Sequence, residues 1–127
     1  MSTADQVLDP PWWPVELRYR RADRALHVAY DDGAVFALPA ELLRVESPSA
    51  EVQGHNPADR KLVPGKRNVG IRAIEPVGNY AVRLVFDDGH DTGIFTWRFL
   101  RDAGERQDEL MARYTEALAK AGLSRDR

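Results

Sequence analysis

Apolar and polar residues alternate along several short stretches of the chain. Val15, Leu17 and Tyr19 are separated by charged residues, which is the period of a half-buried strand. The same alternation predicts further strands over residues 25–30, 34–38, 69–75, 80–86 and 92–96. In the strand over 80–86, alternate residues from Tyr80 to Phe86 are expected to face the core.

Asp-Gly pairs stand between consecutive predicted strands, at Asp32-Gly33 and Asp88-Gly89. Such a pair predicts a two-residue type I′ hairpin turn, because both of its positions favour positive φ. The spacing of apolar residues predicts helices over 40–45, 97–103 and 105–121, the second of them ended by Gly104. The expected fold is therefore α+β. It is a largely antiparallel twisted sheet of two β-hairpin units plus adjoining strands, with short helices and one longer C-terminal helix packed on it.

The two halves of the chain echo each other. Tyr30-Asp31-Asp32-Gly33 and Phe86-Asp87-Asp88-Gly89 are each followed by a strand, a short helix and a Leu-Arg pair. The echo indicates either a structural pseudo-symmetry or two independent uses of a favourable turn. The arginines of the two pairs, Arg44 and Arg101, suit anion recognition. The simpler interpretation is a cation at each helix C-terminus, paired with an aspartate of one of the turns.

The centre of the chain, residues 46–68, is polar and rich in proline, glycine, serine and asparagine. It is predicted to form one long loop, which in a compact domain is either functional or mobile. Its basic stretch over 60–67 is interpreted as a solvated loop, with a phosphate or acidic-partner contact as the alternative. The domain is expected over residues 15–122, between a flexible lead-in at 1–14 and a polar tail at 123–127.

Composition argues against several classes of protein. A net charge of −2 and a sequence pI of about 5.9 favour neither nucleic acid nor an anionic membrane as a partner. No apolar run approaches the ~20 residues of a transmembrane helix, and the N-terminus lacks the features of a signal peptide. The absence of cysteine rules out disulfides, thiol catalysis and cysteine-ligated zinc or iron–sulfur clusters. A cytoplasmic protein without a cofactor is expected, and exposed edge strands leave dimerisation open.

Candidate chemistry is confined to the centre of the chain and the second hairpin. His90 is interpreted first as a residue that hydrogen-bonds the long loop and pins it, and alternatively as a ligand beside Ser47 and Ser49. If the loop folds back, His55 and either Glu46 or Glu51 would complete a weak divalent-metal site with His90. A small enzyme acting at the same surface would need these hydroxyls and imidazole within hydrogen-bond reach.

The two adjacent tryptophans near the N-terminus have either a structural or a binding role. Trp12 and Trp13 are expected to cap the open end of a sheet or cover a helix, and alternatively to anchor a partner. The motifs of Walker loops, nucleophile elbows, zincins and dinucleotide-binding turns do not occur in the sequence.

The residues from Tyr30 to Gly104 resemble a known family. The matching pieces include Glu75-Pro76-Val77-Gly78-Asn79-Tyr80-Ala81 and the motif D-G-H-x-(S/T)-G-(I/L)-(Y/F)-x-W, which begins at Asp88. On these residues the chain is identified as a member of the domain-of-unknown-function family DUF971, which resembles the N-terminal domain of gamma-butyrobetaine hydroxylase. The oxygenase domain of that hydroxylase is not part of these residues, so its activity is not expected.

In the hydroxylase the domain resembles a zinc module. Its ligands come from an L-R-x-x-C-x-C-x-x-C motif and from a histidine in the later hairpin. Laid on this chain, the cysteine positions become Ser47, Ser49 and Val52, and the histidine position is His90. Two hydroxyls and an aliphatic side chain are poor zinc ligands, so the family's zinc site is not expected here.

Other members of the family resemble appendages of iron–sulfur carrier ATPases, which implies a binding role. The expected function is a non-catalytic binding or adaptor domain. Its unidentified protein partner would belong to cofactor or iron–sulfur metabolism, or would be a neighbouring oxidoreductase. The candidate binding surface combines the long loop with the hairpin at 89–92, and comprises Arg44, Ser47, Ser49, Glu51, His55 and His90. The alternative is a small metal-binding protein that uses His90, His55 and a loop carboxylate.

Overall fold

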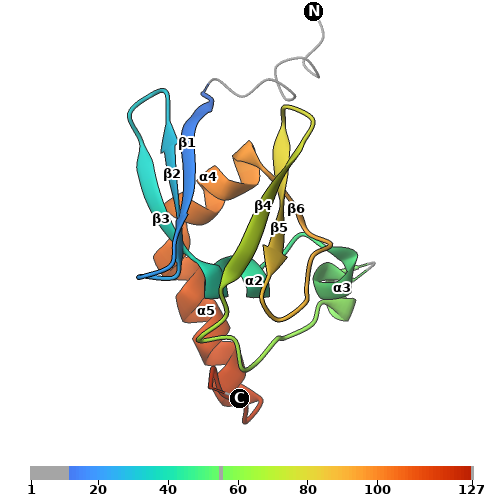
Figure 1. Ribbon diagram of the computed structural model, residues 1–127. Helices are drawn as coiled ribbons and strands as arrows, with labels where there is room; N and C mark the ends of the chain where they lie inside the picture. The colour runs from blue at the N-terminus through green and yellow to red at the C-terminus, as the bar shows by residue number, and fades with distance from the viewer. Residues whose placement is uncertain (1–11, 55, 127) are drawn as a thin grey trace, which may run out of the picture.

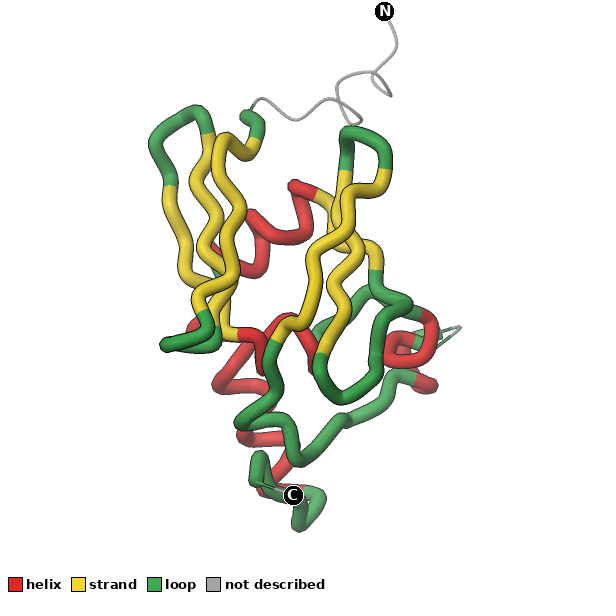
Figure 2. The backbone as a smooth tube through the Cα atoms, viewed as in Figure 1, coloured by secondary structure: helices red, strands yellow, loops and turns green. Residues whose placement is uncertain are grey.

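The computed structural model, which describes residues 12–54 and 56–126, contains two three-stranded antiparallel sheets. The first sheet has the order β1 (Pro14–Arg20), β2 (Ala25–Tyr30) and β3 (Val35–Pro39). The second has the order β4 (Ile71–Val77), β5 (Ala81–Phe86) and β6 (Ile94–Thr96). The two sheets stand side by side (Figures 1 and 2). The predicted α+β fold is confirmed, with the strands divided between two sheets.

A helix follows the last strand of each sheet, and one longer helix comes after them. α2 (Ala40–Val45) continues directly from β3, and α4 (Trp97–Glu105) continues directly from β6. α4 contacts both β3 and β6, and it lies behind the two sheets in Figure 1. The longer α5 (Gln107–Lys120) contacts α2 and α4. Each helix in the described part of the chain is too short or too polar to cross a bilayer.

A single main hydrophobic core joins the two sheets. Leu26 and Val28 enter it from β2, and Leu84 and Phe86 enter it from β5. They do so in alternation because successive side chains of a strand point to opposite faces. The helices add buried leucines to the same core, namely Leu42, Leu43, Leu100 and Leu110. Burial of these side chains, at about 25 cal/mol per Å² of apolar surface, is the main force that holds the sheets together.

The two hairpin turns have the same geometry, and it differs from the predicted one. In the first turn Tyr30 N–H donates to Ala34 O at 2.8 Å, and in the second Phe86 N–H donates to His90 O at 2.9 Å. Of the loop residues only the glycines, Gly33 at φ +93° and Gly89 at φ +95°, have positive φ. The type I′ prediction is therefore wrong. Each hairpin has a three-residue loop that ends in a left-handed glycine.

Each arginine of the echoed Leu-Arg pairs binds the turn of the opposite half. Arg44 Nε donates to Asp88 Oδ2 at 2.7 Å, and Arg101 Nη2 donates to Asp32 Oδ2 at 2.8 Å. The predicted pairing with a turn aspartate is confirmed, and each arginine binds the turn of the other half. The predicted position at a helix C-terminus holds for Arg44 and is wrong for Arg101, because α4 continues to Glu105. Because the halves also share the order of three strands and a helix, the sequence echo is a structural pseudo-symmetry.

Trp12 has the capping role that the sequence suggests. Its ring meets Tyr30 edge-on with a centroid separation of 5.1 Å, and the Arg101 guanidinium lies 4.8 Å from its centroid. Trp13 is more exposed than Trp12, and its backbone N–H donates to Asp31 Oδ1 at 3.0 Å. The first tryptophan therefore covers the end of the core, and the second remains at the surface. Residues 1–11 of the expected lead-in lie outside the described residues.

Two residues expected on core faces are exposed. Tyr80 has 52% of its surface exposed, because it belongs to the turn before β5 and the strand begins at Ala81. Val15 is exposed as well, because the pairing of β1 with β2 shifts between Pro14 and Glu16. Such a bulge reverses the inward and outward alternation on one side of it.

The helix boundaries also differ from the predicted ones. Gly104 lies within α4, which ends at Glu105, and a Cβ built at Gly104 would lie 2.5 Å from the Phe36 ring. The predicted long loop contains α3 (Ala50–Gln53) and a 3₁₀ helix, η1 (Pro57–Asp59). The described residues of the predicted tail pack on the domain, because Gly65 N–H donates to Ser124 O at 2.9 Å.

Candidate functional site

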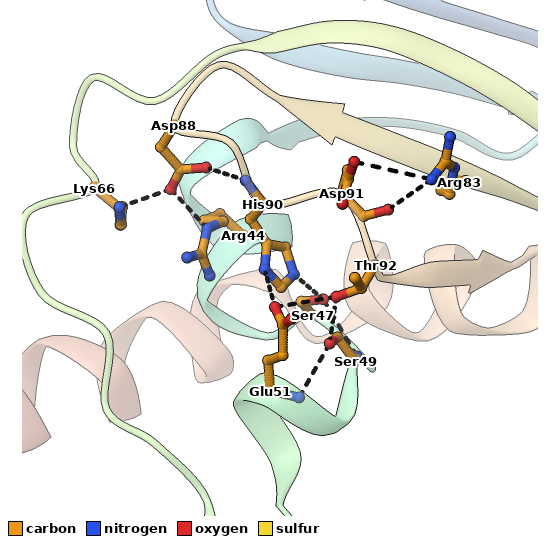
Figure 3. A network of polar contacts seen from close by, with 10 residues as sticks. All are labelled: Arg44, Ser47, Ser49, Glu51, Lys66, Arg83, Asp88, His90, Asp91 and Thr92. Atoms are coloured by element: carbon orange, nitrogen blue, oxygen red, sulfur yellow. Dashed lines mark hydrogen bonds and ion pairs between the residues drawn. The ribbon is translucent and has the colours of Figure 1, made fainter.

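The second hairpin and the start of the central segment meet around His90, as Figure 3 shows. The Ser47 hydroxyl lies 3.0 Å from His90 Nε2, and Glu51 Oε1 lies 3.2 Å from His90 Nδ1. The predicted hydrogen bonding of His90 to the long loop is confirmed. An ionised carboxylate can only accept hydrogen bonds, so Nδ1 carries the proton and Nε2 accepts from the Ser47 hydroxyl.

Local backbone chemistry explains why the serines point at the hairpin. α2 ends at Val45, and Ser47 Oγ then accepts a hydrogen bond from Ser49 N–H at 3.3 Å. Ser49 is the N-cap of α3, and its hydroxyl accepts from Glu51 N–H at 3.1 Å. This is the ordinary capping role of serine, which satisfies a helix donor that has no partner within the helix. The cap fixes α3 and places the Glu51 carboxylate beside His90.

The hairpin supplies the remaining contacts. Thr92 Oγ1 donates to Glu51 Oε1 at 3.2 Å and lies 2.7 Å from Ser49 Oγ. With the Thr92 proton used in this way, the Ser49 hydroxyl donates to Thr92. Gly93 makes room for the approach, because a Cβ at this position would lie 2.5 Å from Ser47 Oγ. Every hydroxyl and ring nitrogen of this set therefore has a partner.

A cluster of charged residues borders the network. Asp88 binds Arg44 Nε at 2.7 Å and Lys66 Nζ at 2.6 Å, and its Oδ1 accepts from His90 N–H at 3.0 Å. Burial by itself raises the pKa of the Asp88 carboxyl. The hydrogen bonds from Lys66, His90 N–H and Arg44 outweigh burial and lower this pKa to about 2. Asp88 is thus a fixed negative charge that ties the turn to two cations.

The imidazole of His90 is held neutral. Burial lowers the pKa of His90, and the positive charge of Arg44 lowers it further, while Glu51 and Asp88 act in the opposite direction. The net shift is downward. His90 therefore serves as a neutral hydrogen-bonding residue, with one ring nitrogen as donor and the other as acceptor.

The order of serine, imidazole and carboxylate matches a hydrolase triad, but the serine cannot be reached. Ser47 has 0% of its surface exposed. A nucleophile has to contact the carbon that it attacks, so the observed geometry offers no path for acyl transfer. What this arrangement does chemically is fasten the segment over 47–51 to the hairpin.

Comparison with known proteins adds the family to this geometry. The family model for the gamma-butyrobetaine hydroxylase-like N-terminal domain matches residues 17–101. The chain belongs to this family. No curated protein matches it.

Several solved structures of related proteins are similar to this gamma-butyrobetaine hydroxylase-like domain. One NMR solution structure is 50% identical with a TM-score of 0.77, and covers 90% of each chain. Another is 48% identical with a TM-score of 0.79, and covers 92% of this chain and 89% of its own. A crystal structure of a DUF971-family protein of unknown function from Acidithiobacillus ferrooxidans is 43% identical with a TM-score of 0.59. It covers 70% of this chain and 89% of its own.

The residues at the family's expected zinc positions do not fit zinc in this member. The structure brings Ser47, Ser49 and His90 together as that resemblance requires, and Val52 is a buried apolar side chain. Zinc sites use thiolate, imidazole or carboxylate donors in a tetrahedral set, and both nitrogens of His90 already have partners. Within residues 12–54 and 56–126, no cluster of three or more histidine, cysteine or acidic residues is arranged to hold a metal ion.

Most of the predicted binding surface is brought together in this gamma-butyrobetaine hydroxylase-like domain. Arg44 borders the Ser47, Ser49, Glu51 and His90 network through Asp88, whereas His55 lies outside the described residues.

Two residues contribute more to the site than the sequence indicates. Thr92 belongs to the predicted surface only as part of the hairpin, although it occupies the Ser/Thr position of the family motif. Lys66 belongs to the basic stretch interpreted as a solvated loop, and the sequence contains no local signal that pairs it with Asp88.

Proposed function

We propose that this domain is a non-catalytic binding or adaptor domain. Its contact surface is the segment over 46–54 together with the hairpin over 89–92, and we refer to it as the loop–hairpin surface. The observation that supports this proposal is the closed network in which Ser47, His90 and Glu51 bind one another. The network positions the exposed side chains around it instead of leaving a reactive group accessible.

Rigidity is the property that favours binding over catalysis. A hydrogen bond of this kind contributes about 1 kcal/mol to stability, and several of them fasten α3 to the second hairpin. A surface that is already ordered loses less conformational entropy when a partner docks. Glu51, with 62% of its side chain exposed, and the exposed Thr92 lie on the outer side of the network.

The partner is proposed to be a protein of cofactor or iron–sulfur metabolism, or a neighbouring oxidoreductase, in the cytoplasm. Support for this class comes from the family resemblance. The net charge of −2 argues against nucleic acid and anionic membranes as partners.

Site-specific photo-crosslinking tests the proposal. Ala50 is exposed at the first position of α3, so a photo-crosslinking amino acid fits there without disturbing the network. Ala37, exposed on β3 of the other sheet, provides a matched control. In a bacterial lysate, a specific protein should crosslink through position 50 and not through position 37. Identical products from both positions, or none, would refute the loop–hairpin surface.

A metal-binding function is the second candidate, because the Glu51 carboxylate lies 3.2 Å from His90 Nδ1. In this alternative His55 would join them around a divalent ion. Zinc titration followed by the histidine NMR signals decides the question. Binding tighter than about millimolar, or about −4 kcal/mol, that His90→Ala abolishes would favour the metal site. Histidine NMR signals that do not change on addition of zinc would refute the metal-binding function.

A further inference from the structure

A groove runs between α5 and the segment over 60–63, next to the loop–hairpin surface. It consists of two adjoining cavities of about 190 and 330 Å³. The cavities share Glu46, Arg60 and Arg113 in their linings, so these three residues lie between them. The groove is separate from the hydrogen-bond network around His90 and from the junction between the two sheets.

The floor of the smaller cavity is apolar and well supported. It is formed by a second hydrophobic cluster, separate from the main core, in which Val45 and Tyr114 pack against Leu62 and Val63. The Tyr114 hydroxyl donates to Val63 O, which ties α5 to the segment opposite. The floor therefore offers an apolar surface whose polar groups already have partners.

The rim of the smaller cavity is positively charged. Arg60, Lys61 and Arg113 stand against a single acid, Glu46, in a chain whose net charge is −2. Arg60 binds Glu46 at 2.7 Å, and Arg113 lies 3.6 Å from Glu109. Lys61 makes no ion pair with any residue that the structure describes. The rim thus favours a ligand that brings carboxylates.

The volume of the smaller cavity indicates what can enter it. Pockets for small molecules usually enclose about 300–1,000 Å³, and the apolar cavity is smaller than this, at about 190 Å³. It suits one large apolar side chain, while the adjoining cavity of about 330 Å³ gives room for the residues beside it.

We propose that this groove binds an acidic peptide segment of a protein partner. One large apolar side chain of the segment enters the cavity between Leu62 and Tyr114. Its flanking carboxylates pair with Lys61 and Arg113. This inference rests on the proposed role as a protein-binding domain and names the class of segment that is recognised. Gln53 links the two surfaces, because it lines the larger cavity and its Nε2 donates to Ser47 O at 2.8 Å.

Titration with a synthetic peptide tests the groove. The probe is a short peptide of glutamates around one central leucine, followed by backbone NMR shifts of the whole domain. Shifts are expected over residues 60–63 and 113–117. Replacing the central leucine by alanine should weaken binding about tenfold, since each 1.4 kcal/mol of lost apolar contact is a factor of ten. A lysine version of the peptide should not bind.

Variants of the protein complete the experiment. Lys61→Glu and Arg113→Glu should each weaken binding severalfold. Arg18→Glu, the same charge change on β1, should leave binding unchanged. Ala117→Phe, which fills the smaller cavity without changing charge, should also weaken it. In about 1 M salt, where the Debye length is about 3 Å, the contribution of the rim should largely disappear.

The failure of this inference can be told apart from failure of the proposed function. The groove is not a peptide site if the acidic peptide produces no localised NMR shifts, or if Arg18→Glu weakens peptide binding as much as Lys61→Glu does. Specific crosslinking through Ala50 would then still support the loop–hairpin surface. If instead the groove binds the peptide and position 50 gives no specific crosslink, the partner contacts α5 and not the hairpin.

Discussion

Arg44 and Asp88 come from opposite halves of the chain, and their side chains meet at 2.7 Å. Arg101 and Asp32 make the reciprocal contact at 2.8 Å. The two contacts are alike in geometry and different in environment, because 17% of the Asp88 side chain is exposed against 40% for Asp32.

The residues that follow the two arginines also have different surroundings. Three residues after Arg44 stands Ser47, which packs on Gly93 and begins the polar network. Three residues after Arg101 stands Gly104, which instead packs on the Phe36 ring. One junction between the halves is therefore polar and the other is aromatic. The candidate site lies where the pseudo-symmetry is broken.

Asp88→Asn should destabilise the protein by about 2 kcal/mol, because it leaves the Arg44 charge without its carboxylate. Arg44 Nη1 is already buried without a hydrogen-bond partner among the described residues, so little else can compensate. Urea denaturation at neutral pH measures the loss, which should shrink as the pH falls toward about 2, where Asp88 itself becomes protonated. The matched variant Asp32→Asn should lose less free energy of unfolding than Asp88→Asn. Equal losses in the two variants would contradict the difference in environment.

The depressed pKa of His90 predicts that stability falls as the medium becomes acidic. Below about pH 6.5, the ordinary value for histidine, the unfolded chain binds a proton that folded His90 resists. The unfolded state therefore gains relative stability from about pH 6.5 down to the lowered pKa of folded His90. His90→Asn should be less stable at pH 7 and should show a shallower loss between about pH 7 and 5. Denaturation curves with parallel pH dependence in both proteins would argue against a neutral, buried imidazole.

Gly93→Ala should destabilise the protein by about 1–3 kcal/mol through overpacking. The new methyl group would lie 2.5 Å from Ser47 Oγ and 2.9 Å from the Phe95 ring. The double variant Gly93→Ala with Ser47→Ala should recover part of the loss, since it removes the nearest atom. Thermal unfolding of the two single variants and the double variant measures this coupling. Strict additivity would mean that the hairpin and the central segment are not in contact.

Arg125→Gln should cost about 2 kcal/mol, because it leaves Glu41 buried without its partner. Glu41 has 5% of its surface exposed, and Arg125 donates to it through Nε at 2.8 Å and Nη2 at 2.6 Å. Arg67→Gln removes the exposed pair with Asp126 in the same region and should have a smaller effect. Chemical denaturation compares them. A large effect of Arg67→Gln and none of Arg125→Gln would show that the C-terminal segment is not anchored through Glu41.

The periodicity of the sequence was enough to predict most elements, and the motifs that begin at Glu75 and Asp88 carried the family resemblance. In β2 and β5 every second residue from Leu26 and from Val82 onward is buried, so the buried faces of these strands match the period of two in the sequence. The family resemblance anticipated that the segment around Ser47 would meet His90. The prediction failed for Tyr80 and Val15, where a turn and a bulge change which way a side chain points.

What the sequence determined by itself was the local pattern: which segments are strands or helices, which aspartates stand in turns, and that no thiol is present to bind metal. Tertiary structure alone decided that His90 is neutral, that Ser47 is inaccessible and that Lys66 reaches Asp88. It also decided that a cationic groove opens beside α5. The physical reason is that periodicity reports only the near neighbours of a residue. Burial and pairing depend on side chains that the packing of the two sheets and α5 brings together from distant parts of the chain.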